Sequence, residues 1–349
     1  MTIKKTFSAI LAAAVVFPSA AAFAQNGLDE NLPLLQKSSR SAKENQNVLD
    51  LFLRGKKPAE VFAAGASLVR LPPPPNQENT LYGIILRDGD VLKKVFAAVI
   101  ITSMGSTREE FLPLLADAAQ SQDNALKSYA GAAYTIINPS DEQYADLVIN
   151  LYIYDPAFAQ RAMNLLCSSE KETLKYLKSA AGSDIPQVRA AAASWLGDLQ
   201  TQAATKILLK MAKKERTADV ASAIATALAK NQQYTLDECL KNLDKDHNTP
   251  QANTYALALG FMTGNALNGI KQALENKDVE VRINAARAAA YMAGVLGSDQ
   301  AKEYSTDAAF DKNLLKTLVP QLGVMAKKDT ASVKVYANNA IYQIAKLSE

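Results

Sequence analysis

A spaced triplet of apolar or small residues recurs along most of the chain. It is clearest at Val188, Ala192 and Trp195, which stand at positions i, i+4 and i+7. Triplets of the same kind begin at seven further positions: Val91, Leu126, Phe158, Val220, Ala252, Val281 and Val333. Successive starts lie 29 to 35 residues apart, except for the last step of 52. Because this spacing places three side chains on one stripe of an α-helix, the sequence predicts a repeated amphipathic helix.

A second helix is expected before each marked one. Examples are residues 107–120 before the Leu126 helix and residues 266–276 before the Val281 helix. Two helices per repeat form a hairpin, which cannot bury its apolar stripe alone, so neighbouring hairpins stack and share one core. The sequence therefore predicts an all-α solenoid. Such a fold lengthens without thickening, which suits a chain of 349 residues that is too long for one compact core.

Three stretches carry a family likeness. Residues 112–130 contain Leu-Pro-Leu-Leu followed by an Asp and an Ala-rich helix, and residues 184–197 and 278–288 repeat the Asp, Val-Arg and Ala-Ala marks. These stretches resemble the HEAT-like helical repeats, in particular the short form of about 30 residues. The resemblance covers roughly residues 80–347. It implies a right-handed superhelix of about eight or nine stacked hairpins, which serves as a non-catalytic binding surface.

Some positions depart from the family pattern. Trp195 stands where the family usually has a small residue. Non-basic residues follow the first apolar mark in four repeats: Leu92, Ala159, Ala221 and Asn253. An Asp–Arg ladder between repeats is therefore expected to be interrupted at those four repeats.

Two regions interrupt the repeat. Residues 71–76 read Leu-Pro-Pro-Pro-Pro-Asn, which excludes a helix and favours a stiff connector because each proline fixes φ and lacks an N–H. We expect a loose segment with capping helices over 25–70 (helices at 45–53 and 58–69), the connector over 71–80 and the solenoid over 81–349. The longest repeat step points to an inserted loop or short helix over 294–312. That insertion is either part of a binding surface or a tolerated loop.

The first 24 residues have the pattern of a cleavable signal peptide. Lys4 and Lys5 precede an apolar run over residues 10–17, and Ala22-Phe23-Ala24 forms a small-x-small cleavage site before Gln25. A membrane span would need about 20 apolar residues, and no Cys follows the cleavage site to carry a lipid. We expect export to a bacterial periplasm, or alternatively full secretion, with no membrane insertion after cleavage.

The charge balance restricts the partner class. The chain has 38 basic and 35 acidic residues, a net charge of +3. The only charged side chains that cleavage would remove are those of Lys4 and Lys5. A nearly neutral protein has no broad field to attract nucleic acid or acidic lipid. The expected partner is another protein or a peptide, and the oligomeric state is left open.

No motif in the sequence carries convincing chemistry. Asp244, Asp246 and Asn248 match the start of a calcium loop, but its required Gly and Glu are replaced by Thr249 and Tyr255. The segment around His247, the single histidine, therefore favours a polar turn. No catalytic, cofactor-binding or metal-binding residue is predicted, and no cofactor. An envelope hydrolase whose carboxylates meet only in the fold, and a structural subunit of an envelope assembly, stay open as alternatives.

Two other motifs have structural interpretations. The segment Ser168-Ser169-Glu170-Lys171 matches the Ser-x-x-Lys of penicillin-recognising enzymes, but their Lys-Thr-Gly is absent, so the serines are expected to cap a helix over 173–179. Cys167 and Cys239 lie two to three repeats apart. At about 10 Å per repeat they are too distant for a disulfide, which needs Cα atoms within about 7 Å, so two buried thiols are expected.

A partner-binding face is predicted from the same periodicity. If positions i, i+4 and i+7 point inward, positions i+2 and i+6 point away from the core. They are mostly small or neutral-polar, which suits an apolar or uncharged polar ligand, although plain solvated residues would have the same pattern. These candidates are Gln160, Asn164, Ser194, Thr226, Thr254, Arg287 and Asn339.

Overall fold

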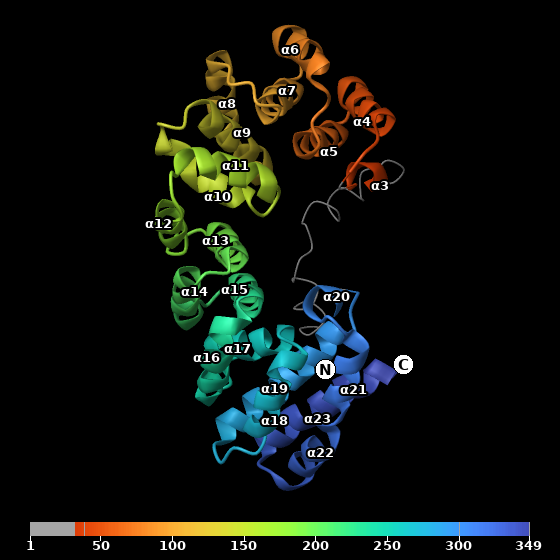
Figure 1. Cartoon of the computed structure of the whole chain (residues 1–349), viewed down its shortest axis with the longest axis vertical. Coiled ribbons are helices and arrows are strands. Elements are labelled where there is room, and N and C mark those ends of the chain that lie inside the picture. The colour runs from red at the N-terminus through yellow and green to blue at the C-terminus, as the bar shows by residue number, and fades with distance from the viewer. Residues whose placement is uncertain (1–31, 38, 300, 349) are drawn as a thin grey trace. The chain divides into compact units, whose positions relative to one another are not determined.

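The computed structural model describes residues 32–348 except 38 and 300, and all regular elements in that range are helical (Figure 1). The predicted signal peptide and its cleavage site lie outside the described residues. The rest of the chain divides into two compact units at Tyr176 and Leu177. We call them the N-terminal and C-terminal units and describe each by itself.

The N-terminal unit alternates outer and inner helices. After the short α3, the inner helices α5, α7, α9 and α11 contact one another in chain order, and the helix before each forms the outer layer. The elements are α3 (Leu32–Leu35), α4 (Ala42–Arg54), α5 (Pro58–Arg70), η1 (Pro75–Gln77), α6 (Glu78–Arg87), α7 (Val91–Ser103), η2 (Glu109–Phe111), α8 (Leu112–Ala118), α9 (Asn124–Ile137), η3 (Glu142–Tyr144), α10 (Ala145–Leu151) and α11 (Pro156–Leu166). Helix α12 (Glu170–Ala180) contains the division between the units.

The C-terminal unit follows the same plan. Its inner helices α13, α15, α17, α19 and α23 contact one another in turn, a row that can be followed in Figure 1. The elements are α13 (Pro186–Leu199), α14 (Gln202–Lys214), α15 (Ala218–Lys230), α16 (Gln232–Lys241), η4 (Asn242–Asp244), α17 (Pro250–Phe261), α18 (Gly264–Ala273), α19 (Val279–Leu296), α20 (Ala301–Tyr304), α21 (Ala308–Lys316), α22 (Val319–Lys328), α23 (Ala331–Ala345) and η5 (Lys346–Ser348). The predicted all-α solenoid is thus confirmed as stacked hairpins in each unit.

Small residues allow the inner helices to pack closely. A Cβ added at Gly197 of α13 would lie 2.8 Å from the Cβ of Ala227 in α15. A Cβ at Gly260 of α17 would lie 2.6 Å from the Cβ of Tyr291 in α19. Trp195, despite its size, is 1% exposed in the same layer. The core of each unit therefore lies where inner helices meet one another and their hairpin partners.

Helix starts follow local capping chemistry. The Asp90 side chain accepts hydrogen bonds from the N–H groups of Leu92 and Lys93, and Asp123 caps α9 in the same way. Ser168 donates its hydroxyl hydrogen bond to Glu172 over 2.9 Å, and Ser169 accepts one from the Glu172 N–H. The predicted cap is confirmed for Ser169, which accepts from a backbone N–H of the first turn, whereas the Ser168 hydroxyl contacts the Glu172 carboxylate instead. Helix α12 begins at Glu170, three residues before the predicted start.

Several sequence expectations need correction or detail. Pro75 and Asn76 belong to the 3₁₀ turn η1, so the expectation of no helix over 71–76 is wrong there, since a first turn does not need the proline N–H. The predicted insertion over 294–312 contains the end of α19, all of α20 and the start of α21. Cys167 and Cys239 are buried free thiols, as expected. Within the described range, no helix has the length and apolar character needed to cross a membrane.

Candidate functional site

The seven predicted partner-binding residues differ in exposure. Asn164 is exposed and accepts a hydrogen bond from Gln160 over 2.8 Å on α11. Ser194, Thr226 and Asn339 are half-buried. Thr254 and Arg287 are buried. The structure does not test the binding role of this set, which stays a prediction.

The expectation of an open face is wrong for Arg287, which is 8% exposed, and for Thr254. The Thr254 side chain is 1% exposed and its hydroxyl donates to the Pro250 carbonyl oxygen over 2.9 Å. Helix α17 has neighbours on both flanks, α15 and α19, and every residue from Thr254 to Phe261 is buried. The buried stripe of this helix is therefore wider than the three marked positions suggest.

Polar side chains connect the inner helices α17, α19 and α23. The Arg287 guanidinium lies 4.9 Å from the centroid of the Tyr336 ring and donates to its hydroxyl over 3.0 Å. Tyr291 of α19 donates to the side-chain oxygen of Asn253 on α17. These contacts reach across repeats, so they hold the side chains in fixed positions. We call Asn253, Arg287, Tyr291 and Tyr336 the polar rail.

Asn284 of α19 links the polar rail to the loop before α17. Its amide donates to the carbonyl oxygens of Leu243 and Lys245 over 2.9 and 2.8 Å, which fixes the start of the loop before α17. Its own side-chain oxygen lies 3.5 Å from Arg287 Nη1. A fully buried polar residue thus has partners on both sides, as the cost of burying an amide requires.

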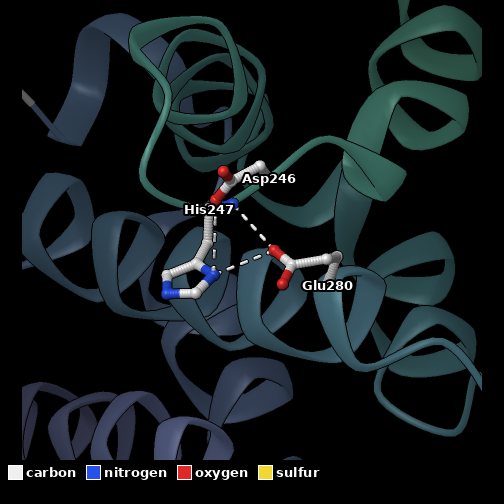
Figure 2. A group of neighbouring side chains, drawn as sticks. All are labelled: Asp246, His247 and Glu280. Carbon is white, nitrogen blue, oxygen red and sulfur yellow. Dashed lines mark hydrogen bonds and ion pairs between the residues drawn. The ribbon is translucent and has the colours of Figure 1, made fainter.

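His247 lies in that same loop, next to the rail. Its Nδ1 is 2.9 Å from Oε2 of Glu280, and its backbone N–H donates to the same oxygen over 2.7 Å (Figure 2). The imidazole meets the Tyr336 ring edge to face, with centroids 5.6 Å apart. A carboxylate only accepts hydrogen bonds, so Nδ1 carries the proton in this arrangement.

Asp246 completes a three-residue group. One ligand atom from each of Asp246, His247 and Glu280 lies within 4.8 Å of the others. Oδ1 of Asp246 is 3.9 Å from Nδ1 of His247. The hydrogen bond from the Asn248 N–H lowers the pKa of Asp246 from its ordinary value, so this carboxyl stays ionised at neutral pH.

Sequence reasoning considered Asp246 and His247 but predicted no metal-binding residue there, and it did not consider Glu280. Asp246 and His247 were placed in a polar turn, and the turn is observed: Asp246 accepts from Asn248, and Thr249 caps α17. Glu280 lies 33 residues after His247, in the first turn of α19. Its acidic position near a helix N-terminus has an ordinary explanation in the helix dipole, so nothing local marks it as a partner of His247.

A buried carboxyl lies in the N-terminal unit. Asp155 is 1% exposed and its Oδ1 accepts from the Phe158 N–H at the start of α11. Burial raises the pKa of this carboxyl, and burial likewise raises the pKa of Tyr129. The Tyr129 and Phe158 rings are stacked with centroids 6.4 Å apart. Asp155 caps a helix within an aromatic cluster, an arrangement that suits a structural role.

Comparison with known proteins supports the repeat architecture. A family profile for HEAT repeats matches residues 146–229, a stretch that begins in α10 and ends in α15. No curated protein matches the chain. The protein is similar to the crystal structure of Kap121p, with 13% identity and a TM-score of 0.36 over 97% of this chain and 45% of that one. The crystal structure of Kap121p bound to RanGTP has 12% identity and a TM-score of 0.36, with 91% of this chain and 43% of that chain covered.

An engineered protein of similar length gives a lower score. It shares 16% identity and a TM-score of 0.26, with 96% of this chain and 98% of that chain covered. The chain spans less than half the length of Kap121p. At these scores the solved structures carry no functional argument, and the HEAT-repeat match over residues 146–229 remains the firm finding.

Proposed function

We propose that the protein is a non-catalytic repeat scaffold that binds another protein or a peptide along its inner helices. The polar rail is the observation that carries this proposal. Arginine and tyrosine are the residue types that supply much of the energy of protein interfaces. Arg287 and Tyr291 are buried, at 8% and 4% exposed, and they hold the half-buried Tyr336 and Asn253 in place. Tyr336 and Asn253 are therefore preorganised for a partner, and little conformational entropy is lost when it docks.

The chemistry of the rail favours a partner with neutral-polar or aromatic groups. Asn253 offers an amide, while Tyr336 offers a ring whose other contacts are Arg287 and His247. Only one of these side chains is cationic. A partner that presents backbone amides or aromatic side chains matches this surface better than a polyphosphate does.

The enzyme alternative receives less support. Two carboxylates, Asp246 and Glu280, do meet beside His247. The Asp246 side chain is 64% exposed, so the group lies open to water, whereas acid–base catalysts are commonly tuned by burial in a cleft. We therefore place the scaffold function first, with the structural subunit of an assembly as an outcome that the following experiment separates.

Site-specific photocrosslinking tests the scaffold proposal. A photoreactive residue at Asn339 on inner helix α23 should give a discrete crosslinked partner in an envelope extract. The matched control places it at Val324 on outer helix α22, which is exposed and should give none. Tyr336→Ala should reduce the Asn339 crosslink at least tenfold, while Tyr342→Ala, on another side of α23, should not. Equal crosslinking at Val324, or a product that is only this chain, contradicts the proposal.

Export is a separate proposal that rests on residues 1–24. A fusion of residues 1–30 to a reporter that is active only outside the cytoplasm should be exported and processed after Ala24. Ala24→Phe should block processing because the last position before the cut must be small, whereas Phe23→Leu should not. A reporter that stays cytoplasmic would overturn the proposed compartment and leave the binding proposal untouched.

A further inference from the structure

We propose that Asp246, His247 and Glu280 bind one divalent transition-metal ion, such as Zn²⁺. One residue of the three supplies an imidazole nitrogen and two supply carboxylate oxygens, all within 4.8 Å of one another (Figure 2). The site joins the loop before α17 to the first turn of α19. It lies beyond the proposed binding function, which does not require it.

The distances suit such an ion. Metal–ligand bonds of about 2.0–2.2 Å in a tetrahedral site put neighbouring ligand atoms about 3.3–3.6 Å apart. The separation of His247 Nδ1 from Glu280 Oε2 is 2.9 Å, and that from Asp246 Oδ1 is 3.9 Å. These two values lie on either side of the required spacing. Closing the site therefore requires small movements of the Asp246 and Glu280 carboxylates toward a common centre.

The donor set selects the class of metal. Ca²⁺ and Mg²⁺ prefer oxygen ligands alone, whereas Zn²⁺, Co²⁺ and Ni²⁺ accept imidazole together with carboxylates. Two carboxylates and one neutral imidazole balance a charge of +2. Three protein ligands leave a position for water, or for a side chain of a bound partner.

Surrounding contacts hold the ligands in place. The Asn248 N–H and side-chain amide both donate to Asp246 Oδ1, over 2.9 and 3.1 Å. The His247 ring is fixed on one side by Tyr336, and the His247 N–H orients Glu280. Such supporting hydrogen bonds raise metal affinity because the ligands lose little freedom on binding.

Metal binding requires one proton to move. In the described arrangement Nδ1–H donates to Glu280 Oε2, while Nε2 carries the lone pair. For the ion to bind Nδ1, the imidazole proton shifts to Nε2, and the Nδ1 lone pair and Glu280 turn from each other to the metal. No proton is lost overall, so the change of tautomer is a specific signature of this site.

The single histidine of the chain makes the test unambiguous. Untagged protein with ¹⁵N-labelled histidine gives one ring system by NMR, in which the protonated nitrogen is identified directly. On addition of one equivalent of Zn²⁺, we expect Nδ1 to become metal-bound and Nε2 to become protonated. Unchanged ring signals, or coordination through Nε2 with Nδ1–H retained, would overturn the proposal.

Calorimetry with Zn²⁺ on the same untagged protein tests the two carboxylates. We expect one ion per chain, and binding weakened at least about tenfold by Asp246→Asn and by Glu280→Gln. Asp246→Asn leaves the contact between His247 and Glu280 intact, so a folding defect is not expected to obscure the result. Asp244→Asn is the matched control in the same loop and should bind as the wild type. Equal affinity of all three variants refutes the site.

Discussion

At the scale of single residues, two arginines connect neighbouring repeats in the same way. Arg189 donates to both carboxylate oxygens of Glu215 over 2.8 and 3.0 Å, and Arg282 does so to Asp329 over 2.8 and 2.7 Å. Each also donates to carbonyl oxygens of the turn before its own helix. Each acid lies one hairpin further along the chain than its arginine. Each pair is therefore a link between repeats, and its two parallel hydrogen bonds make it bidentate.

Breaking this link should cost more than breaking an exposed one. Arg189→Met leaves Glu215, which is 7% exposed, without its cation, and we expect a loss of about 3 kcal/mol in the free energy of unfolding. The exposed pair between Lys230 and Asp198 joins the same two repeats, and Lys230→Met should change stability by less than about 1 kcal/mol. Urea denaturation followed by fluorescence of the single tryptophan, Trp195, measures both, and equal losses would contradict this account.

The Glu215 link also predicts a dependence on pH. Burial alone would raise the pKa of Glu215, but hydrogen bonds from Arg189 and from the Thr217 and Arg216 N–H groups outweigh burial and lower it to about 2. A carboxyl with a lowered pKa in the folded state stabilises the fold above its unfolded pKa of about 4.3. That contribution is lost as pH falls from there toward 2. In Glu215→Gln, the free energy of unfolding should fall less steeply as the pH is lowered over this interval. If it falls as steeply as in the wild type, Glu215 is not responsible.

At the scale of elements, side-chain size decides how closely inner helices approach. At Gly197 the nearest atoms to an added Cβ are the Cβ and the backbone Cα of Ala227, at 2.8 and 2.9 Å. Backbone atoms of a packed helix move only at a cost, so helices α13 and α15 would have to separate. Gly323 of the outer helix α22 does not have this restriction, since an added Cβ there meets nothing within 4 Å.

A pair of identical substitutions tests this difference. Gly197→Ala should destabilise the C-terminal unit by about 1–3 kcal/mol, because overpacking outweighs the better helix propensity of alanine. Gly323→Ala should instead stabilise the same unit by about 0.5–1 kcal/mol, since the added methyl group meets open space in a helix interior. Thermal unfolding of both variants gives the two signs. A stabilising Gly197→Ala would mean that the inner layer is looser than described.

At the scale of the whole molecule, stacked hairpins are expected to transmit changes mainly to their neighbours. Within each unit, each inner helix contacts the inner helices directly before and after it. In such an arrangement stability is approximately a sum of repeat terms and nearest-neighbour terms. A local defect is therefore expected to loosen its own and adjacent repeats rather than the chain as a unit.

Hydrogen exchange measures how far a defect spreads. In Gly197→Ala, amides of α13 and α15 should exchange faster than in the wild type, because their interface is strained. Amides of α5 and α7 in the N-terminal unit should keep wild-type protection. A uniform increase across both units would indicate a single cooperative fold and contradict nearest-neighbour coupling.

Much of the architecture could be predicted from the sequence because its causes are local. The i, i+4, i+7 stripe follows from helix geometry, so Val188, Ala192 and Trp195 were expected to be buried and are. Caps such as Asp123 and Ser169 mark helix starts through bonds within one turn. The repeat period, with small residues on one stripe, implies stacking because a single hairpin cannot shield its apolar side.

The candidate site depends instead on how one repeat is rotated against the next. That rotation brings Glu280 to His247, and it gives Arg189 the acid Glu215 rather than a neighbouring aspartate. It also covers Thr254, which periodicity alone placed on an open face. The spacing of residues within a helix indicates which of them share a face. A contact between repeats depends instead on packing that no single repeat encodes. For that reason these three results required the folded structure.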